Sequence, residues 1–154
     1  MQIRLFQPQD EPQVAELFHH TVRKINIQDY SEEQVRAWSP NDLYFRNWAE
    51  VCSSKFTYIA EENDQIIGFG ELNADGYIDC FYVHYLYQRQ KVASNIYQAI
   101  ETKAQELNLI RLFTEVSITA KPFFIKQGFS VIKRQQVFCR GQKFTNFVME
   151  KQLN

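Results

Sequence analysis

Apolar residues recur three or four positions apart near the start of this chain. Val14, Leu17, Phe18 and Val22 have the spacing of one face of a helix, and Pro12 suits its first turn. Helical spacing of this kind is typical of an amphipathic helix that packs one face on a core. The pattern therefore predicts one such helix in the N-terminal part of the chain.

The rest of the pattern predicts a mixture of short strands and helices. Ser31 opens a capping-box sequence for a second helix, which Pro40 ends, and Asn41 or Asp42 can cap a third helix that runs toward Val51. Alternating apolar positions and turn residues between them predict strands over 3–6, 56–60, 66–72, 77–85, 112–116, 131–138 and 144–149, and helices over 92–107 and 122–127. This order of elements favours a mixed α/β or α+β fold.

Length and composition indicate one domain over residues 1–154. The chain is 45% hydrophobic and 23% charged, which is sufficient for one well-packed core, and it contains no repeat, low-complexity tract or linker. Its formal net charge is -1, whereas general nucleic-acid binders usually carry a strongly basic surface. We therefore expect no nucleic-acid partner.

Other features of the sequence lead us to expect neither a membrane nor a metal partner. The N-terminus lacks the apolar region of a signal peptide, and no run is long enough to span a membrane, so we expect a soluble cytoplasmic protein. Cys52, Cys80 and Cys139 are odd in number, widely spaced and not arranged with His at ligand spacing. We expect reduced thiols and no metal site.

The polar loop between the strand over 77–85 and the helix over 92–107 has the features of a phosphate site. The first N–H groups of a helix have no partners within it, and the helix dipole places positive charge there. Arg89 and Lys91 add two cationic side chains beside this helix end. A diphosphate group could therefore bind here.

This loop resembles the acyl-CoA-binding loop of GNAT acetyltransferases. The family pattern is Gln or Arg, two variable residues, Gly, one variable residue, then Gly or Ala. The corresponding positions here are Gln88, Arg89, Gln90, Lys91, Val92 and Ala93. Lys91 replaces the central glycine of the family pattern. That glycine lets the backbone approach the pyrophosphate, and it adopts dihedrals that cost other residues about 1–2 kcal/mol. The departure bears on coenzyme affinity, not on the fold.

A second segment resembles the same family independently. After their fifth strand, GNAT proteins commonly have Ala, two variable residues, Phe-Tyr, three variable residues and Gly-Phe. Ala120, Phe123, Phe124, Gly128 and Phe129 keep this spacing. Phe124 replaces the Tyr that often protonates the departing CoA thiolate in the family, so another proton donor, such as Tyr82 or Tyr30, or none, would act here.

The resemblance implies the GNAT fold, a mixed and mostly antiparallel sheet of about seven strands flanked by helices. Strands four and five of this sheet splay apart, and the free edge binds the pantetheine arm of acetyl-CoA. The positions that the resemblance assigns to acetyl-CoA are Tyr82, Val83, Gln88, Arg89, Gln90, Lys91, Val92, Ala93, Ser94, Ser117 and Phe124. Ser117 stands where many members have an Asn, although cross-strand hydrogen bonding explains a Ser there equally well.

The implied reaction is attack of an amine on the acetyl thioester, which requires a neutral amine. A lysine-like amine of pKa about 10.4 is deprotonated at pH 7 to roughly one part in a few thousand, so a base matters. Asp79 and Glu71 are the candidate catalytic bases, and Glu115 is a third. Glu71 could instead be solvated or paired with a Lys. Asp79 lies in an apolar strand, where an unpaired carboxylate is costly.

The resemblance places the acceptor near the first helices. His20, Tyr30 and Trp38, together with Asp29, lie in the region that shapes the acceptor site in this family. We therefore expect a GNAT N-acetyltransferase that transfers the acetyl group of acetyl-CoA directly to an amine of a small molecule or peptide. Lys91 and Phe124 leave two alternatives open, a non-catalytic acyl-CoA-binding or sensing domain and an interaction module with a degenerate cofactor loop. The acceptor and a homodimer also stay open.

Overall fold

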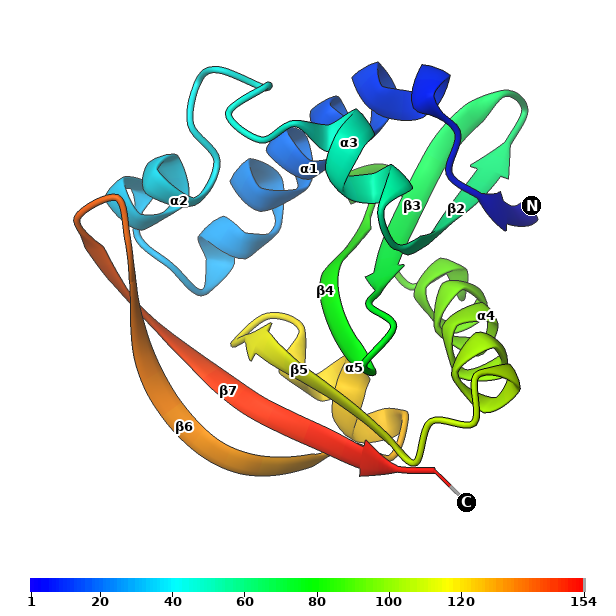
Figure 1. Cartoon of the computed structure of the whole chain (residues 1–154). Helices are drawn as coiled ribbons and strands as arrows, with labels where there is room; N and C mark the ends of the chain where they lie inside the picture. Colours follow the sequence, from blue (N-terminus) through cyan, green and yellow to red (C-terminus); the bar gives the residue numbers. More distant parts are fainter. Residues whose placement is uncertain (154) are drawn as a thin grey trace.

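The computed structural model describes residues 1–153 and contains one seven-stranded sheet in the order β1-β2-β3-β4-β5-β7-β6 (Figure 1). Neighbouring strands run antiparallel except β4 and β5, which are parallel. The strands are β1 (Gln2–Leu5), β2 (Phe56–Glu62), β3 (Gln65–Leu72), β4 (Tyr77–Val83), β5 (Arg111–Ser117), β6 (Ser130–Cys139) and β7 (Gln142–Gln152). The expected mixed, mostly antiparallel sheet of about seven strands is confirmed.

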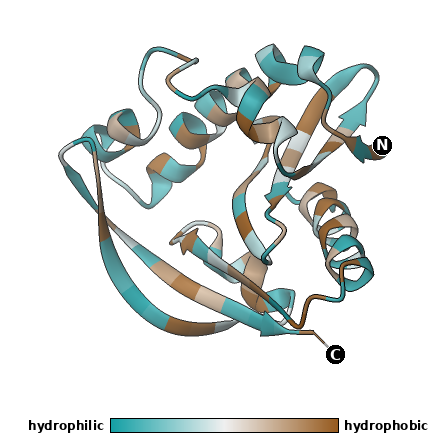
Figure 2. Ribbon diagram, viewed as in Figure 1, coloured by the Kyte–Doolittle hydropathy of each residue, from teal (hydrophilic) through white to brown (hydrophobic). Residues whose placement is uncertain are grey.

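Helices cover both faces of this sheet and divide its apolar residues into two cores. One core lies under α4 and α5, and the other lies under α1, α2 and α3. The helices are α1 (Glu11–Lys24), α2 (Glu32–Trp38), α3 (Trp48–Ser53), α4 (Val92–Glu106) and α5 (Lys121–Lys126), with short 3-10 turns at Pro8–Asp10, Asn26–Gln28 and Tyr85–Tyr87. Figure 2 shows the matching pattern, with apolar residues along β3 and polar residues along much of β6.

Helix α4 packs very closely on β3 because β3 presents two glycines to it. A Cβ atom on Gly68 or on Gly70 would lie 2.8 Å from an atom of the Ile96 side chain. A side chain at either position would push α4 away from the sheet. The two glycines therefore fix the position of the helix whose N-terminus is predicted from the sequence to be a phosphate site.

Several element boundaries differ from the sequence-based prediction by a few residues, and two of them have a clear local cause. The third helix begins at Trp48 and not after Asn41 or Asp42, because Asn47 supplies its cap by accepting a hydrogen bond from the Glu50 N–H at 3.2 Å. The Asp42 carboxylate instead accepts from the Tyr44 N–H at 2.9 Å and closes a local turn. The strand expected over 77–85 ends at Val83, where the His84 ring begins a 3-10 turn by accepting from the Leu86 N–H.

None of the helices within residues 1–153 has both the length and the apolar character that a membrane-spanning helix requires.

Candidate functional site

The two parallel strands at the centre of the sheet separate soon after they meet. β4 and β5 pair only at Tyr77 with Phe113 and at Ile78 with Thr114. The buried Thr114 hydroxyl donates to the Ile78 carbonyl at 2.8 Å and closes the paired end. Beyond this point the strands diverge toward Val83 and Ser117, which is the expected splay between strands four and five.

A β-bulge in β4 lies at the start of this split. Gly70 pairs with Phe81 and Leu72 pairs with Ile78, so two residues, Asp79 and Cys80, stand opposite Glu71 alone. A bulge bends its strand and redirects side chains, and bulges are common beside active sites. Here the bulge places the carboxylate of Asp79 beside that of Glu71.

A cavity of about 680 Å³ occupies the split. It is bounded by β4, the loop before α4, the end of β5, and α5. The site residues predicted from the sequence that line it are Trp38, Asp79, Tyr82, Val83, Gln88, Arg89, Lys91, Val92, Ala93, Ser94, Ser117 and Phe124. The predicted residues outside its lining are His20, Tyr30, Glu71 and Gln90. The structure thus brings most of the expected cofactor positions around one space.

The loop before α4 has the backbone that a glycine-rich loop would have. Arg89 and Lys91 both adopt left-handed conformations, with φ of 60° and 66°. Lys91 directly precedes the first residue of α4, Val92, and its side chain caps none of the helix N–H groups. Lys91 and the first residues of α4 line the cavity, so an anion in it could accept hydrogen bonds from the uncapped N–H groups of the helix.

On β4, the backbone of Val83 faces the split, whereas the backbone of Tyr82, which was also expected to bind the cofactor, faces β3. The His84 N–H donates across to Ile67 of β3, so the alternation of an antiparallel pair directs the N–H of the preceding Val83 to the opposite edge. The Val83 carbonyl accepts from the side chains of Thr21 at 3.1 Å and Gln88 at 2.7 Å. Gln88 thereby ties the loop to the strand.

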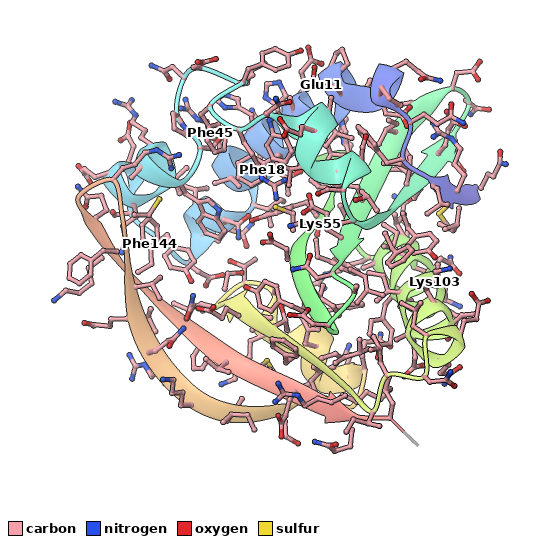
Figure 3. The ribbon with its side chains drawn as sticks, in the orientation of Figure 1. Glu11, Phe18, Phe45, Lys55, Lys103 and Phe144 are labelled. Atoms are coloured by element: carbon pink, nitrogen blue, oxygen red, sulfur yellow. The ribbon has the colours of Figure 1, made fainter. Side chains whose placement is uncertain are left out.

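Glu71 and Asp79 differ in their access to the cavity. Glu71 is fully buried and accepts from both terminal nitrogens of Arg46, at 2.8 and 2.9 Å, and from Lys55 at 3.2 Å. The Asp79 side chain is 38% exposed and accepts from Lys55 at 2.7 Å. Lys55 lies between α3 and β4, as Figure 3 shows. Asp79 is thus the carboxylate of this pair that a ligand can reach.

Burial and charge set the protonation of the groups around this pair. Burial opposes the charge of Lys55, but its hydrogen bond to Asp79 and the charge of Glu71 outweigh burial and raise the pKa of its ammonium. Burial, with the nearby charge of Glu71, raises the pKa of the Cys52 thiol to about 12. Lys55 is therefore charged and Cys52 is a neutral thiol near pH 7.

Two phenols are candidates to replace the Tyr that Phe124 displaces. Phe124 is 2% exposed and packs against Phe81 and Phe129. The Tyr30 hydroxyl donates to the Thr145 carbonyl at 2.6 Å and accepts from the Ile118 N–H at 2.9 Å, so its proton is already bound. Tyr82 lines the cavity, and burial raises the pKa of its phenol well above 10.0, while a hydrogen bond with Trp38 opposes that rise.

Of the residues predicted to shape the acceptor site, some line the cavity and others do not. Trp38 lines the cavity, whereas His20 is exposed and its ring stacks edge-on to Tyr85 at 6.5 Å. Thr21, Ile25 and Asn26, at the end of α1, also line the cavity and were not found from the sequence. The sequence showed only the helical spacing of the apolar residues, and this spacing does not indicate which residues at the end of the helix line a cavity.

Ser117 and Glu115, at the end of β5, also line the cavity. Ser117 accepts from the Ala120 N–H at 3.0 Å, which leaves its hydroxyl proton available to a ligand. Glu115 lines the cavity and accepts from the Gln135 side chain at 2.6 Å. Among residues 1–153, no three or more His, Cys, Asp or Glu side chains gather in a way that could hold a metal ion.

The sequence matches both a known family model and a curated protein. Residues 26–151 match the family model described as "Acetyltransferase (GNAT) domain". The chain is 37% identical over 149 residues to "Uncharacterized N-acetyltransferase YafP" of Escherichia coli (strain K12), covering 97% of this chain and 94% of that protein.

Solved structures show the same fold. A "GCN5-Related N-acetyltransferase: Aminotransferase, Class-II" from Rhodopseudomonas palustris superimposes with a TM-score of 0.92 at 30% identity, covering 99% of this chain and 95% of that one. The PaiA N-acetyltransferase of Thermoplasma acidophilum, solved in complex with coenzyme A, superimposes with a TM-score of 0.81 at 18% identity, covering 99% and 98%.

Proposed function

Because this chain belongs to the GNAT acetyltransferase family, we propose that it transfers the acetyl group of acetyl-CoA directly to an amine of a small molecule or peptide. The observation that carries the proposal is the split between β4 and β5, whose cavity opens onto the N-terminus of α4. This arrangement offers a strand edge to an amide-containing arm and a helix end to a diphosphate. Acetyl-CoA contains both groups in sequence. The PaiA relative, solved with coenzyme A, supports the choice.

We assign the cofactor contacts by their position around the cavity. Val83 would bind the pantetheine arm through its backbone, with the Tyr82 side chain beside it. The pyrophosphate would lie on the segment 88–94, where the helix N–H groups and the cations of Arg89 and Lys91 meet. Ser117 and Phe124 would line the opposite wall.

Asp79 is the proposed general base. Its carboxylate would take a proton from the acceptor ammonium, directly or through a water molecule, and the freed lone pair would attack the thioester carbonyl carbon. Collapse of the tetrahedral intermediate then breaks the carbon–sulfur bond and releases the CoA thiolate, and the nitrogen gives its second excess proton to water. Glu71 is fully buried between two cations, so its proposed part is to hold those cations and not to meet the substrate.

The thiolate can receive its proton from one of two sources. Phe124 cannot donate, and the Tyr30 proton is bound to a backbone carbonyl. The Tyr82 phenol lies in the cavity wall and is the remaining candidate of the two phenols. Water is the other source, because a thiol of pKa near 8.5 is a good leaving group without a dedicated acid.

Release of the CoA thiol tests the proposal. Acetyl-CoA would be incubated with a panel of small amines and peptides with free N-termini, and thiol formation compared with a sample that contains no amine. The proposal predicts amine-dependent thiol release and an acetylated product by mass spectrometry. Binding of acetyl-CoA with no turnover across the panel would favour a non-catalytic acyl-CoA sensor, which Lys91 in the loop and Phe124 in the wall also allow.

A further inference from the structure

Four charged side chains meet at the wall of the cavity, which Asp79 lines, and they come from four separate segments. Glu71 lies on β3, Asp79 on the β4 bulge, Arg46 in the segment before α3, and Lys55 between α3 and β2. Arg46 engages Glu71 through both terminal nitrogens, at 2.8 and 2.9 Å, and lies 3.5 Å from Asp79. The two positive and two negative charges balance, so no net charge is buried.

Lys55 is the member of this cluster that holds the exposed carboxylate. Its Nζ lies 2.7 Å from Asp79 Oδ2 and 3.2 Å from Glu71 Oε1, and its side chain is only 15% exposed. Glu71 already has a two-bond contact with Arg46, so Lys55 is not needed to neutralise it. Of the two contacts that Lys55 makes in this cluster, the one to Asp79 is the shorter.

The geometry at Asp79 is one-sided. Oδ2 accepts hydrogen bonds from both Lys55 and Arg46, and Oδ1 accepts from neither of them. A carboxylate that rests on a bulge and is 38% exposed would otherwise rotate freely. The ion pair to Lys55 thus fixes which oxygen of the Asp79 carboxylate is directed away from the cations.

We propose that Lys55 is a positioning residue for the reaction: it holds the Asp79 carboxylate in one orientation at the wall of the β4–β5 split, so that Oδ1 can accept the proton of the acceptor ammonium. This inference rests on the proposed function, and specifically on Asp79 as the base. Lys55 does not touch the substrate and acts through Asp79. The competing explanation is that Lys55 merely stabilises the fold by pairing with the buried Glu71.

A double-mutant cycle on kcat separates these explanations. The four proteins are the wild type, Lys55→Met, Asp79→Asn and the double variant, each assayed with an amine of pKa near 10. Lys55→Met is expected to lower kcat by about 10- to 100-fold, within the range that general bases contribute, with the KM for acetyl-CoA unchanged within about twofold. In the Asp79→Asn background the same change is expected to lower kcat by less than about twofold, because its target is already gone.

Two controls accompany the cycle. Lys133→Met removes an exposed lysine on β6 and should leave kcat unchanged. Lys55→Gln keeps an N–H donor for Asp79 without the charge, is expected to retain more activity than Lys55→Met, and replaces it in the cycle if Lys55→Met does not fold.

Each outcome of the cycle decides between the explanations. An equal loss of kcat from the Lys55 substitution in the wild-type and Asp79→Asn backgrounds would overturn the inference, as would a Lys55 variant with wild-type kcat. Lost thermal stability with unchanged kcat would identify a purely structural ion pair. Absence of amine acetylation by the wild type would instead overturn the proposed function, and this inference with it.

Discussion

Lys91 shows how a residue can replace a glycine while keeping the conformation of the glycine. Its φ of 66° lies in the left-handed region, which costs a residue with a Cβ about 1–2 kcal/mol. Arg89, two positions earlier, has a φ of 60° and bears the same cost. Strain of this kind persists where the surroundings over-determine the backbone, and it is common in ligand-binding loops. The strain at these two cations is consistent with the phosphate contact proposed for this loop.

Lys91→Gly is expected to raise the free energy of unfolding by about 0.5–1 kcal/mol, because relief of the left-handed strain exceeds the added entropy of the unfolded chain. Chemical denaturation measures this change. Lys103→Gly, the same substitution inside α4, should instead destabilise by about 1 kcal/mol. Affinity for acetyl-CoA should change little, since easier backbone approach offsets a lost charge. A large loss of affinity would mean that the Lys91 ammonium binds phosphate directly.

Asp79→Asn is expected to lower turnover by about 10²- to 10⁴-fold for amines of pKa near 10.4, and less for α-amines of pKa near 8. The amide cannot accept a proton, and amines that are already partly neutral need that step less. Steady-state kinetics across amines of graded pKa measure the difference, and Glu115→Gln, in the same cavity, shows whether the third candidate base contributes. Equal activity of Asp79→Asn and wild type at all pH values would remove Asp79 from the mechanism.

Sequence reasoning found Asp79 but not its surroundings. Lys55 and Asp79 are 24 positions apart, and Arg46 and Glu71 are 25 positions apart. Pairs at this separation leave no periodic signal in a single sequence. The β4 bulge was also invisible, because one extra residue in a strand does not interrupt an apolar run. The loop before α4 was predictable because its residues are contiguous.

Tyr30 connects three parts of the fold. The residue precedes α2, its hydroxyl donates to the backbone of Thr145 on β7, and it accepts from the backbone of Ile118 just beyond β5. Its ring packs on Trp38 and Phe144. The segment between α1 and α2 is thereby held against the end of β5, where the cavity begins.

Tyr30→Phe removes the hydroxyl and leaves a buried carbonyl and a buried N–H without their side-chain partner. The free energy of unfolding should fall by about 1–3 kcal/mol, as judged by urea denaturation. Tyr44→Phe, at a half-exposed tyrosine before α3, should change it by no more than about 0.5 kcal/mol. The connecting role would be contradicted by equal stability of the two variants.

The start of α3 illustrates the limit of local helix signals. Asn41 and Asp42 have the residue types of an N-cap, yet the cap is Asn47. Both sites offer a side-chain oxygen, and the choice depends on tertiary contacts such as the hydrogen bond from the Ala49 N–H to the Glu11 carboxylate at 2.7 Å. The fold class was predictable because it depends on element order and type, which the pattern carried.

Stability of the whole chain should depend on pH through Asp10, which joins β1 to the start of α1. Burial opposes ionisation of this carboxyl, but hydrogen bonds from Arg4, at 2.8 and 2.9 Å, and from the Gln7 N–H outweigh burial and lower its pKa below 3.8. A carboxyl with a depressed pKa stabilises the fold fully above its unfolded pKa and loses that contribution as pH falls through its folded pKa.

Asp10→Asn should accordingly reduce the free energy of unfolding at pH 7 by about 1–2 kcal/mol. The difference from wild type should shrink as the pH falls below about 4, which denaturation at a series of pH values measures. A difference that stays constant down to about pH 2 would show that Asp10 does not titrate in this way.

The cavity between β4 and β5 is the feature on which the whole account depends, and thermal unfolding with acetyl-CoA tests it most directly. Ligand at about a hundred times its dissociation constant should stabilise the protein by roughly 2.7 kcal/mol, which corresponds to a rise in Tm of several degrees for a domain of this size. An acetyl-CoA site in this cavity predicts this rise with acetyl-CoA and no comparable rise with ATP, which shares the phosphates but lacks the pantetheine arm. No rise at millimolar acetyl-CoA, or an equal rise with ATP, would contradict it.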